Sequence, residues 1–364
     1  MKNEKLIFGV MSGTSLDGID VVLIKIGNKN IKLIDFAHKP YSNKLANALL
    51  LIQKPIHNDL ELSIELGLLH AQTTASMINT MLKKLNIYPK KVCCIGYHGQ
   101  TIRHQPSKKF SVQIGNAHML AEKTNIAVVA DFRNRDIVAG GQGAPLVPSF
   151  HQKVFSSRTK NRVIINVGGI SNLTYLKIGD KLIGFDCGPG NLLLDYWVQK
   201  NKNKNYDDKG KWASTGNIIP NLLIEFMKEP FFQKKPPKST GRDLFNSCWL
   251  EKFDHKKESP EDVQRTLLEL TAISINLAIA RYCNEADEIF ICGGGSKNIF
   301  LKNRLEQLTT QKINNTEELG IPSQSVEAVA FGWLANERVN NIPNNSPEIT
   351  GSSGKRILGI THPA

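Results

Sequence analysis

Three glycine-bearing turns follow apolar, strand-like segments of this 364-residue sequence. Exposed backbone N–H groups bind a phosphate at close range, and glycine permits both that approach and a positive φ. Nearby hydroxyls add donors, and a carboxylate can hold a hydrated magnesium ion. Neither a Walker motif nor a Rossmann glycine fingerprint is present, which argues against those two kinds of nucleotide site. The turns are Gly13-Thr14-Ser15-Leu16-Asp17-Gly18, Gly168-Gly169 and Gly293-Gly294-Gly295.

Two carboxylates stand where a reaction could use them. Asp186 ends an apolar run and precedes the turn Gly188-Pro189-Gly190 and a helical segment. A carboxylate there could act as a general base, or it could cap the following helix. Glu327 stands early in the last helical segment, where most glutamates face solvent or favour the helix dipole. The local sequence leaves both alternatives open.

An arginine and a histidine follow two other buried segments. Arg133 could bind an anion through two parallel hydrogen bonds, although a loop arginine more often pairs with neighbours, here Asp131 or Asp136. His98 follows a strand-like run and could act as a base. Because no partner for it is evident in the sequence, a structural role is favoured.

The elements that would position these residues alternate between strands and helices. A strand–glycine turn–strand hairpin occurs twice, over 5–27 and 162–178, which indicates two halves of related topology. Glycine turns at matching places in both halves favour a nucleotide held in a cleft between two lobes. The expected strands are 6–11, 19–26, 31–36, 92–97, 110–114, 126–130, 162–167, 172–178, 181–186 and 288–292. The expected helices are 59–85, 191–199, 260–282, one beginning at 298, and 325–336.

The helix expected over 59–85 has one apolar stripe at a spacing of three to four residues. We expect this stripe to face the core of the first half. Its members are Leu62, Leu66, Leu69, Met77 and Met81.

The length of the chain predicts more than one core. It exceeds the roughly 250–300 residues at which a single hydrophobic core stops growing. We expect a first lobe over 1–130 and a second over 131–337, with residues 338–364 able to pack back on the first. Residues 200–258 form a polar, Lys/Asn-rich insertion in the second lobe, with nine lysines from Lys200 to Lys238.

Composition excludes several classes of protein. With 41% hydrophobic and 22% charged residues, the chain is neither disordered nor membrane-spanning, and the absence of a signal-like segment predicts a cytoplasmic protein. The net charge is +13, but only 11 of the 46 basic residues are arginine and the lysines are scattered, which favours a solvated basic surface over a nucleic-acid site. The six cysteines have no zinc-like spacing, and we expect them to be reduced.

Together the motifs resemble those of the 1,6-anhydro-N-acetylmuramic acid kinases of bacterial cell-wall recycling. The resemblance keeps its order over essentially the whole chain. Its residues are 9–20 (GVMSGTSLDGID), 96–101 (GYHGQT), 131–133 (DFR), 140–148 (GGQGAPLVP), 166–174 (NVGGISNLT), 185–191 (FDCGPGN), 238–242 (KSTGR), 292–295 (CGGG) and 358–359 (LG).

This resemblance implies an α/β fold of the actin/hexokinase/Hsp70 (ASKHA) type, with ribonuclease-H-like halves around a nucleotide cleft. It implies that ATP, with Mg²⁺, phosphorylates O6 of the anhydro sugar while water attacks C1, giving N-acetylmuramic acid 6-phosphate and ADP. The sugar and ATP would be the partners, with no nucleic acid or membrane, and a homodimer is left open.

The resemblance also implies roles for particular residues. Asp186 would be the general base on the water, and Asp17 would hold the metal through water. The sugar would contact Arg133, Glu327, Gln100 and Thr101, with Arg133 able to pair with the lactyl carboxylate. The residues expected to bind ATP are Gly13, Thr14, Ser15, Leu16, Asp17, Gly18, Ile19, Asp20, Gly168, Gly169, Gly293 and Gly294.

One departure and two alternatives remain. Cys187 stands beside the expected base where many relatives have threonine, and a missing hydroxyl there could remove a hydrogen bond that orients Asp186 or the water. A sugar kinase that leaves the ring intact is one alternative. A non-catalytic protein that binds ATP, or one that binds nucleic acid through its charge, is another.

Overall fold

The chain forms two compact units in the computed structural model, which describes residues 4–27, 30–54 and 56–364. The first unit comprises Met1–Phe150 with Ser325–Ala364, and the second comprises His151–Gln324. Residues 131–150 and 325–337, which we expected in the second lobe, therefore lie in the first unit. Residues 325–337 belong to the first unit because helix α11 (Val326–Val339) packs against the first strand of that unit.

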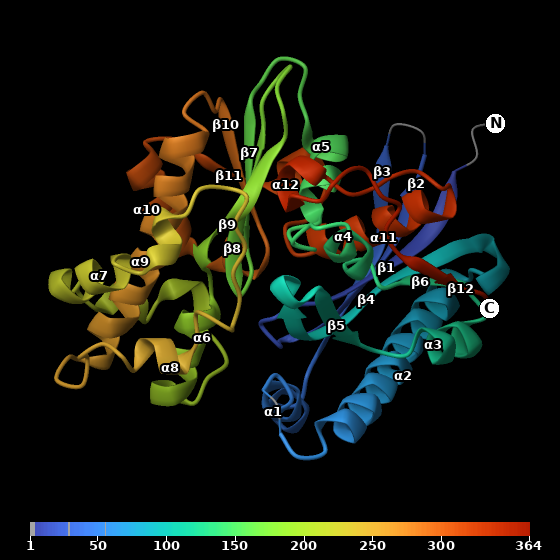
Figure 1. The fold of residues 1–364 in the computed structure, drawn as a ribbon, viewed down its shortest axis with the longest axis horizontal. Helices are drawn as coiled ribbons and strands as arrows, with labels where there is room; N and C mark the ends of the chain where they lie inside the picture. The colour runs from blue at the N-terminus through green and yellow to red at the C-terminus, as the bar shows by residue number, and fades with distance from the viewer. Residues whose placement is uncertain (1–3, 28–29, 55) are drawn as a thin grey trace. The chain divides into compact units, whose positions relative to one another are not determined.

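The first unit is built on a seven-stranded mixed sheet in the order β12-β6-β4-β1-β2-β3, with β5 paired to β4 (Figure 1). Strands β1, β2 and β3 are antiparallel neighbours, whereas β4 runs parallel to β1 and β6 runs parallel to β4. The strands are β1 (Lys5–Ser12), β2 (Gly18–Ile26), β3 (Ile31–Pro40), β4 (Val92–Gln105), β5 (Phe110–Ile114), β6 (Val128–Ala130) and β12 (Ile360–His362).

The second unit repeats this plan in a five-stranded sheet of order β11-β10-β7-β8-β9. Strands β7, β8 and β9 are again antiparallel neighbours, whereas β10 runs parallel to β7 and β11 runs parallel to β10. The shared order and directions are those of ribonuclease-H-like halves, so the expected α/β fold of the ASKHA type is confirmed. The strands are β7 (Arg162–Val167), β8 (Ile170–Leu176), β9 (Ile183–Pro189), β10 (Glu288–Cys292) and β11 (Ile313–Asn315).

Helices cover both faces of the first sheet. Helix α2 packs on the face that carries Phe8 and Val10. Helix α11 approaches the other face at Gly9 and Gly96, which are partners in β1 and β4; a Cβ at either would strike a backbone carbonyl of α11. The helices of this unit are α1 (Asn43–Leu51), α2 (Asp59–Leu85), α3 (Ala117–Thr124), α4 (Asn134–Val138), α11 and α12 (Pro347–Thr350), and α5 (Val147–Phe155) contains the boundary between the units.

Two expectations about the first unit were wrong. Strand β4 does not end at Tyr97 as expected but continues to Gln105, because its second half pairs with β5. In α2 the side chain of Leu69 is 45% exposed, and His70 and Thr74 are buried in its place. Polar groups can occupy that stripe because each has a hydrogen-bond partner there.

The core of the second unit lies between its sheet and α9 (Pro260–Tyr282). The insertion over 200–258, expected to be polar, contributes an aromatic cluster to this core. The members of that cluster are Phe226, Phe231, Phe232, Phe245, Trp249 and Phe253. The other helices are α6 (Leu192–Lys202), α7 (Pro220–Met227), α8 (Ser247–Leu250) and α10 (Ile299–Thr309).

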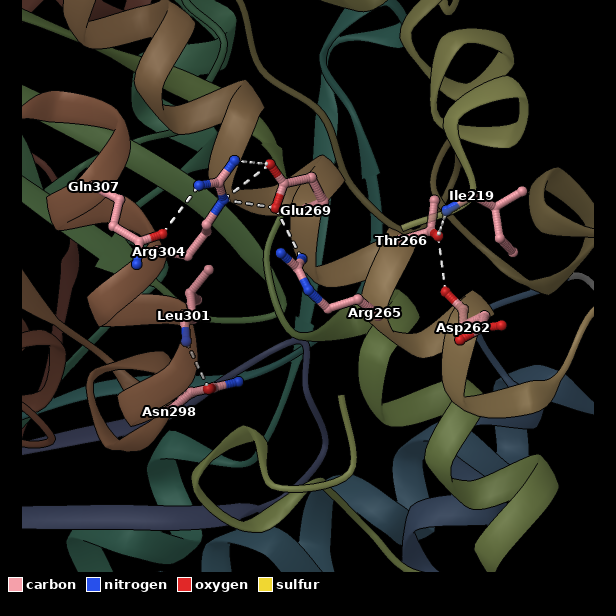
Figure 2. Close-up of polar contacts among 9 residues, drawn as sticks. All are labelled: Ile219, Asp262, Arg265, Thr266, Glu269, Asn298, Leu301, Arg304 and Gln307. Atoms are coloured by element: carbon pink, nitrogen blue, oxygen red, sulfur yellow. Dashed lines mark hydrogen bonds and ion pairs between the residues drawn. The ribbon is translucent and has the colours of Figure 1, made fainter. Parts of the chain in front are cut away.

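A buried ion cluster joins α9 to α10 (Figure 2). The Glu269 carboxylate accepts hydrogen bonds from Arg265 at 2.8 Å and from Arg304 at 2.7 to 3.0 Å. Burial raises the pKa of the Glu269 carboxyl, but the bonds from Arg304 and Arg265 outweigh that effect and hold the pKa below its ordinary value. The Glu269 charge is thus paired on both sides, and the middle of α10 is fixed against α9.

Candidate active site

The turn over Gly13–Asp17 joins β1 to β2 and forms the first part of the candidate site. Leu16 has a left-handed backbone, with φ of 61°, and its side chain is buried against Leu49 and Leu66. The Asp17 side chain is exposed, and the Ser15 hydroxyl donates to its Oδ1 at 2.9 Å. The tip therefore presents its backbone and polar side chains while Leu16 anchors it.

The remaining first-unit residues expected at ATP lie in or beside β2. Gly18 and Ile19 are buried, and the Ile19 side chain belongs to the apolar core. Asp20 is partly exposed, and its Oδ1 lies 2.7 Å from the Nδ1 of His38. Only the backbone of Ile19 could contact a ligand, whereas Asp20 keeps a carboxylate near the turn.

A buried hydrogen-bond network supports this turn from beneath. The Ser12 hydroxyl donates to Gln100 Oε1 at 2.7 Å, so its oxygen can only accept from Tyr41 at 2.6 Å and from the Nε2 of His70 at 3.1 Å. His70 therefore carries its proton on Nε2, and its Nδ1 accepts from the Tyr97 hydroxyl at 2.6 Å. Burial lowers the pKa of His70 to about 4, consistent with this neutral form.

Gln100 connects the network to the turn. Its Nε2 donates to the carbonyl of Gly13 at 3.1 Å, and its side chain is fully buried. The neighbouring Thr101 is partly buried, and its Oγ1 accepts from Gln113 at 3.2 Å. The structure thus places both residues, expected at the sugar, within the scaffold of the first unit, with Gln100 directly beneath the turn.

Arg133 is held at the end of β6 by a histidine and a carbonyl. Its guanidinium contacts His98 Nε2 at 2.9 and 3.2 Å and donates to the Gly143 carbonyl at 2.7 Å. His98 Nδ1 lies 2.7 Å from the Gly99 carbonyl and must donate to it, which leaves Nε2 as the acceptor. Burial, reinforced by the Arg133 charge, lowers the pKa of His98 well below its ordinary value. His98 therefore positions the arginine, in line with the structural role that its sequence context favours.

The two neighbouring aspartates, the alternative partners for Arg133, are engaged elsewhere. Asp131 Oδ1 accepts from the side chain of Asn134 at 2.9 Å. Asp136 is fully buried, and its carboxylate accepts from the Gly143 N–H at 2.9 Å and from Thr350 at 2.8 Å.

Glu327, the other residue expected at the sugar, lies in the first turn of α11 and is partly buried.

In the second unit, the two expected glycine turns lie side by side. The carbonyls of Gly168 and Gly169 accept from the N–H groups of residues 190–192, at the start of α6, at 2.8 to 3.1 Å. Strand β10 runs parallel to β7 and ends at Cys292, and the next residue, Gly293, has φ of 79°. A Cβ at Gly293 would collide with Asn166 and Val167, so only glycine lets the two strand ends approach. Gly294 next to it is exposed.

Asp186 lies on β9, and its side chain is 6% exposed. The insertion docks beside it: the Asp186 N–H donates to the Lys238 carbonyl at 3.2 Å, and the Thr240 N–H donates to Asp186 Oδ2 at 2.9 Å. These bonds fix the orientation of the carboxylate. Among the described residues, no group of three potential metal-ligating side chains occurs, so the Asp186 carboxylate is not part of such a cluster.

Two cations of the same insertion lie partly or largely buried. Burial lowers the pKa of Lys238, whose ammonium lies 4.5 Å from the centre of the Phe231 ring. Burial also lowers the pKa of Arg242 to about 10, so this guanidinium stays charged at neutral pH. We did not assign Lys238 or Arg242 to the site from the sequence. The family motif 238–242, which contains both residues, was the sequence feature that could have pointed to them.

Cys187 directly follows the expected base. Its side chain is buried in the apolar core together with Phe185, and burial, reinforced by the nearby Asp186 charge, raises the pKa of its thiol well above the ordinary value. The side chain at this position therefore belongs to the core, and the neutral thiol is compatible with that environment.

The family model for anhydro-N-acetylmuramic acid kinase matches residues 5–364. The chain belongs to the anhydro-N-acetylmuramic acid kinase family. It is 45% identical over 359 residues to the protein of that name from Nitrosospira multiformis and 44% identical to that from Nitrosomonas europaea, covering 98% of this chain and 98 to 99% of theirs. The kinase from Pseudomonas syringae pv. tomato is 43% identical over 98% of both chains.

Two solved structures of other proteins are more distantly similar to this chain. Component A of the (R)-2-hydroxyglutaryl-CoA dehydratase from Acidaminococcus fermentans gives a TM-score of 0.48 at 9% identity, over 90% of this chain and 96% of that one. A ROK-family glucokinase from Streptomyces griseus gives 0.40 at 10% identity, over 91% and 99%. These scores are too low to carry an argument, and the fold assignment rests on the strand order.

Proposed function

We propose that this family member is an ATP-dependent carbohydrate kinase that acts on 1,6-anhydro-N-acetylmuramic acid in peptidoglycan recycling. It transfers the γ-phosphoryl group of ATP to O6 and opens the anhydro ring with water at C1. The products are N-acetylmuramic acid 6-phosphate and ADP. The observation that carries the proposal is the match of the whole chain to one kinase family, joined to a fixed carboxylate at Asp186.

Asp186 is suited to accept a proton from water. A base must be held in one orientation, and the hydrogen bond from the Thr240 N–H to Oδ2 fixes the Asp186 carboxylate in this way. The carboxylate is nearly buried, which excludes competing solvent from its vicinity. These properties support a role as the general base.

The glycine turns are suited to phosphate groups in each unit. In the first unit the turn 13–17 presents the Thr14 and Ser15 hydroxyls on an anchored backbone. In the second, the Gly168-Gly169 turn is bonded to the start of α6 and lies beside Gly293. We assign ATP binding to these turns, with Gly294 presenting an exposed backbone toward the nucleotide.

The donor set also fits a magnesium ion. Mg²⁺ keeps several waters and is held by one or two carboxylates together with substrate phosphates. The exposed Asp17 carboxylate suits such a water-mediated contact, and Asp20 provides a second carboxylate on the adjoining strand. When bound, the ion would neutralise charge on the transferring phosphoryl group.

The sugar is expected to contact Arg133 and Glu327. The Arg133 guanidinium is held by His98 and the Gly143 carbonyl and remains a cation suited to the lactyl carboxylate. Gln100 and Thr101, also expected at the sugar, would act chiefly through the scaffold that they build.

The test is an assay of the purified protein with ATP, Mg²⁺ and the anhydro sugar. Mass spectrometry and ³¹P NMR should show a 6-phosphate whose mass includes one added water. A phosphorylated sugar with an intact ring would instead establish the non-hydrolytic kinase. Absence of any phosphorylated sugar would overturn the proposal.

A further inference from the structure

Four polar side chains share one rung of the second sheet. Cys292, Asn166, Asn172 and Asp186 are successive partners across β10, β7, β8 and β9. Cross-strand partners point to the same face, with Cβ atoms about 4.5–5.5 Å apart. Asn172 therefore stands beside Asp186 on the face opposite the apolar core.

The backbone is irregular at the end of this row. Ser171 pairs with Gly188 while Asn172 pairs with Asp186, so Cys187 is an extra residue in β9. Such a bulge bends the strand and changes the direction of the side chains next to it. Bulges of this kind are frequent beside active sites, which is consistent with Asp186 having a directed carboxylate.

Hydrogen-bond partners differ sharply along the row. The Cys292 thiol donates to Asn166 Oδ1 at 3.8 Å. Asn172 Oδ1 is buried, and no residue that the structure describes donates to it; the same holds for Thr240 Oγ1, whose own N–H is bonded to Asp186. Buried polar atoms nearly always have a partner. Two unpartnered oxygens on residues that both adjoin one carboxylate indicate a bound donor.

We propose that Asn172 Oδ1 and Thr240 Oγ1 bind and orient the water molecule that Asp186 deprotonates, an inference that rests on the proposed function. Water has two O–H groups, so it can donate one to Asp186 and the other to Asn172 while a lone pair faces C1 of the sugar. A sugar hydroxyl has one hydrogen and could satisfy only one of these acceptors. The Thr240 hydroxyl gives the water a third polar partner, within the two to four that a buried water requires.

The step balances without a further reactant. The water oxygen forms a bond to C1 as the C1–O6 bond breaks, and the water proton passes to the Asp186 carboxylate. The O6 electron pair forms a bond to the γ-phosphorus of ATP, and the bond from that phosphorus to the bridging oxygen breaks to release ADP. The site residues direct the water, and the proposed kinase reaction supplies every other atom.

Two substitutions test this role without disturbing the fold. Asn172→Leu and Thr240→Val each remove an oxygen that has no partner among the residues the structure describes, so the melting temperature should stay the same or rise. Turnover should fall by about tenfold to a hundredfold, since a misdirected water reacts slowly, while the KM for ATP stays unchanged.

Thr266→Val is the matched control. The Thr266 hydroxyl is also buried, but it accepts from the Ile219 N–H at 2.9 Å and donates to the Asp262 carbonyl at 2.7 Å (Figure 2). Removing it should lower the melting temperature and leave turnover unchanged. A merely structural role for Asn172 and Thr240 would give this same pattern in their variants, and that result would overturn the inference.

Asn172→Asp supplies a readout that packing alone would not move. This variant keeps an acceptor oxygen but adds a second carboxylate beside Asp186, which raises the apparent pKa of the pair. The acid limb of the kcat profile should therefore move to higher pH, whereas Asn172→Leu should lower the plateau without moving the limb. An unmoved acid limb in an active Asn172→Asp protein contradicts the inference.

The outcomes separate the inference from the proposed function. If the wild-type protein makes no sugar 6-phosphate, the proposed function fails and the water site fails with it. If the wild type is active and Asn172→Leu and Thr240→Val keep full turnover, only the water site is overturned.

Discussion

The two units share one strand order, yet the hydrogen bonding at their candidate sites differs. In the first unit, Ser12, His70 and Gln100 form a network in which each polar side-chain atom has a partner, and that network holds the opening turn. In the second unit, Asp186 lies beside Asn172 and Thr240, each of which carries a buried oxygen with no partner in the described chain.

This difference separates scaffold from reaction site. A closed network leaves no acceptor for a ligand and stabilises the fold, whereas an incomplete one is destabilising until something binds. The Glu269 cluster between α9 and α10 is closed in the same sense as the network under the opening turn, because the carboxylate is paired with Arg265 and Arg304. We therefore expect substitutions in the closed networks to change stability, and substitutions around Asp186 to change turnover.

The largest effect is expected at the incomplete site. Asp186→Asn keeps the shape of the side chain but removes the base, so kcat should fall on the order of 10³-fold, within the range for general base catalysis. ATP affinity, measured by calorimetry, should change little. A variant that keeps more than a tenth of wild-type turnover would show that this carboxylate is not the base.

Among the closed networks, the ion cluster should be the most sensitive. Glu269→Ala leaves Arg265 and Arg304 without their shared carboxylate, and breaking a buried pair in this way destabilises a protein by about 3–5 kcal/mol. Urea unfolding measures the loss. The exposed Glu258→Ala serves as the control and should change the free energy of unfolding by less than about 0.5 kcal/mol. Equal effects of the two variants would argue that the cluster is dispensable.

A substitution in the network under the opening turn should lower the unfolding free energy by somewhat less than Glu269→Ala does. His70→Phe fills the space but leaves the Tyr97 and Ser12 hydroxyls without their imidazole partner, which costs about 1–3 kcal/mol of unfolding free energy at pH 7. If the network also positions the turn, the KM for ATP should rise. Unchanged stability would mean that the network is not the support we describe.

The smallest predicted effect is the pH dependence of the difference in unfolding free energy between wild type and His70→Phe. His70 is neutral in the folded chain with a pKa of about 4, whereas an unfolded histidine takes up a proton below about 6.5. Wild-type stability contributed by this group is therefore lost as the pH falls from 6.5 towards 4. The stability gap between wild type and His70→Phe should shrink by about 1–2 kcal/mol between pH 7 and pH 5. A gap that widens would reverse the assigned protonation state.

Much of the strand framework could be predicted because it depends on local patterns. The β-branched runs before and after the turns at Gly13 and Gly168 placed both hairpins, and the α9 helix has the predicted bounds. The exposure of Leu69 could not be predicted, because His70 is buried only by virtue of partners on β1 and β4.

The candidate site was harder to predict because its contacts are distant in the sequence. Asp186 could be proposed from its position at a strand end, but Thr240 lies 54 residues further on and meets it only in the folded chain. The insertion that contains Thr240 looked polar because its lysines outnumber its aromatic residues, and only the structure shows Phe226 and Trp249 packed together. Neither the bulge at Cys187 nor the unpartnered oxygens have a local sequence signal.

The central claim, that one site both phosphorylates O6 and adds water at C1, is tested most directly by isotope transfer. The protein is given ATP, Mg²⁺ and the anhydro sugar in ¹⁸O-labelled water, and the product is analysed at the earliest turnovers. Unlabelled N-acetylmuramic acid 6-phosphate in the same water corrects for slow exchange at C1. We predict one ¹⁸O at C1 and none in the phosphate for each ADP formed; a phosphorylated product that lacks the C1 label, or carries label in the phosphate, would contradict the account.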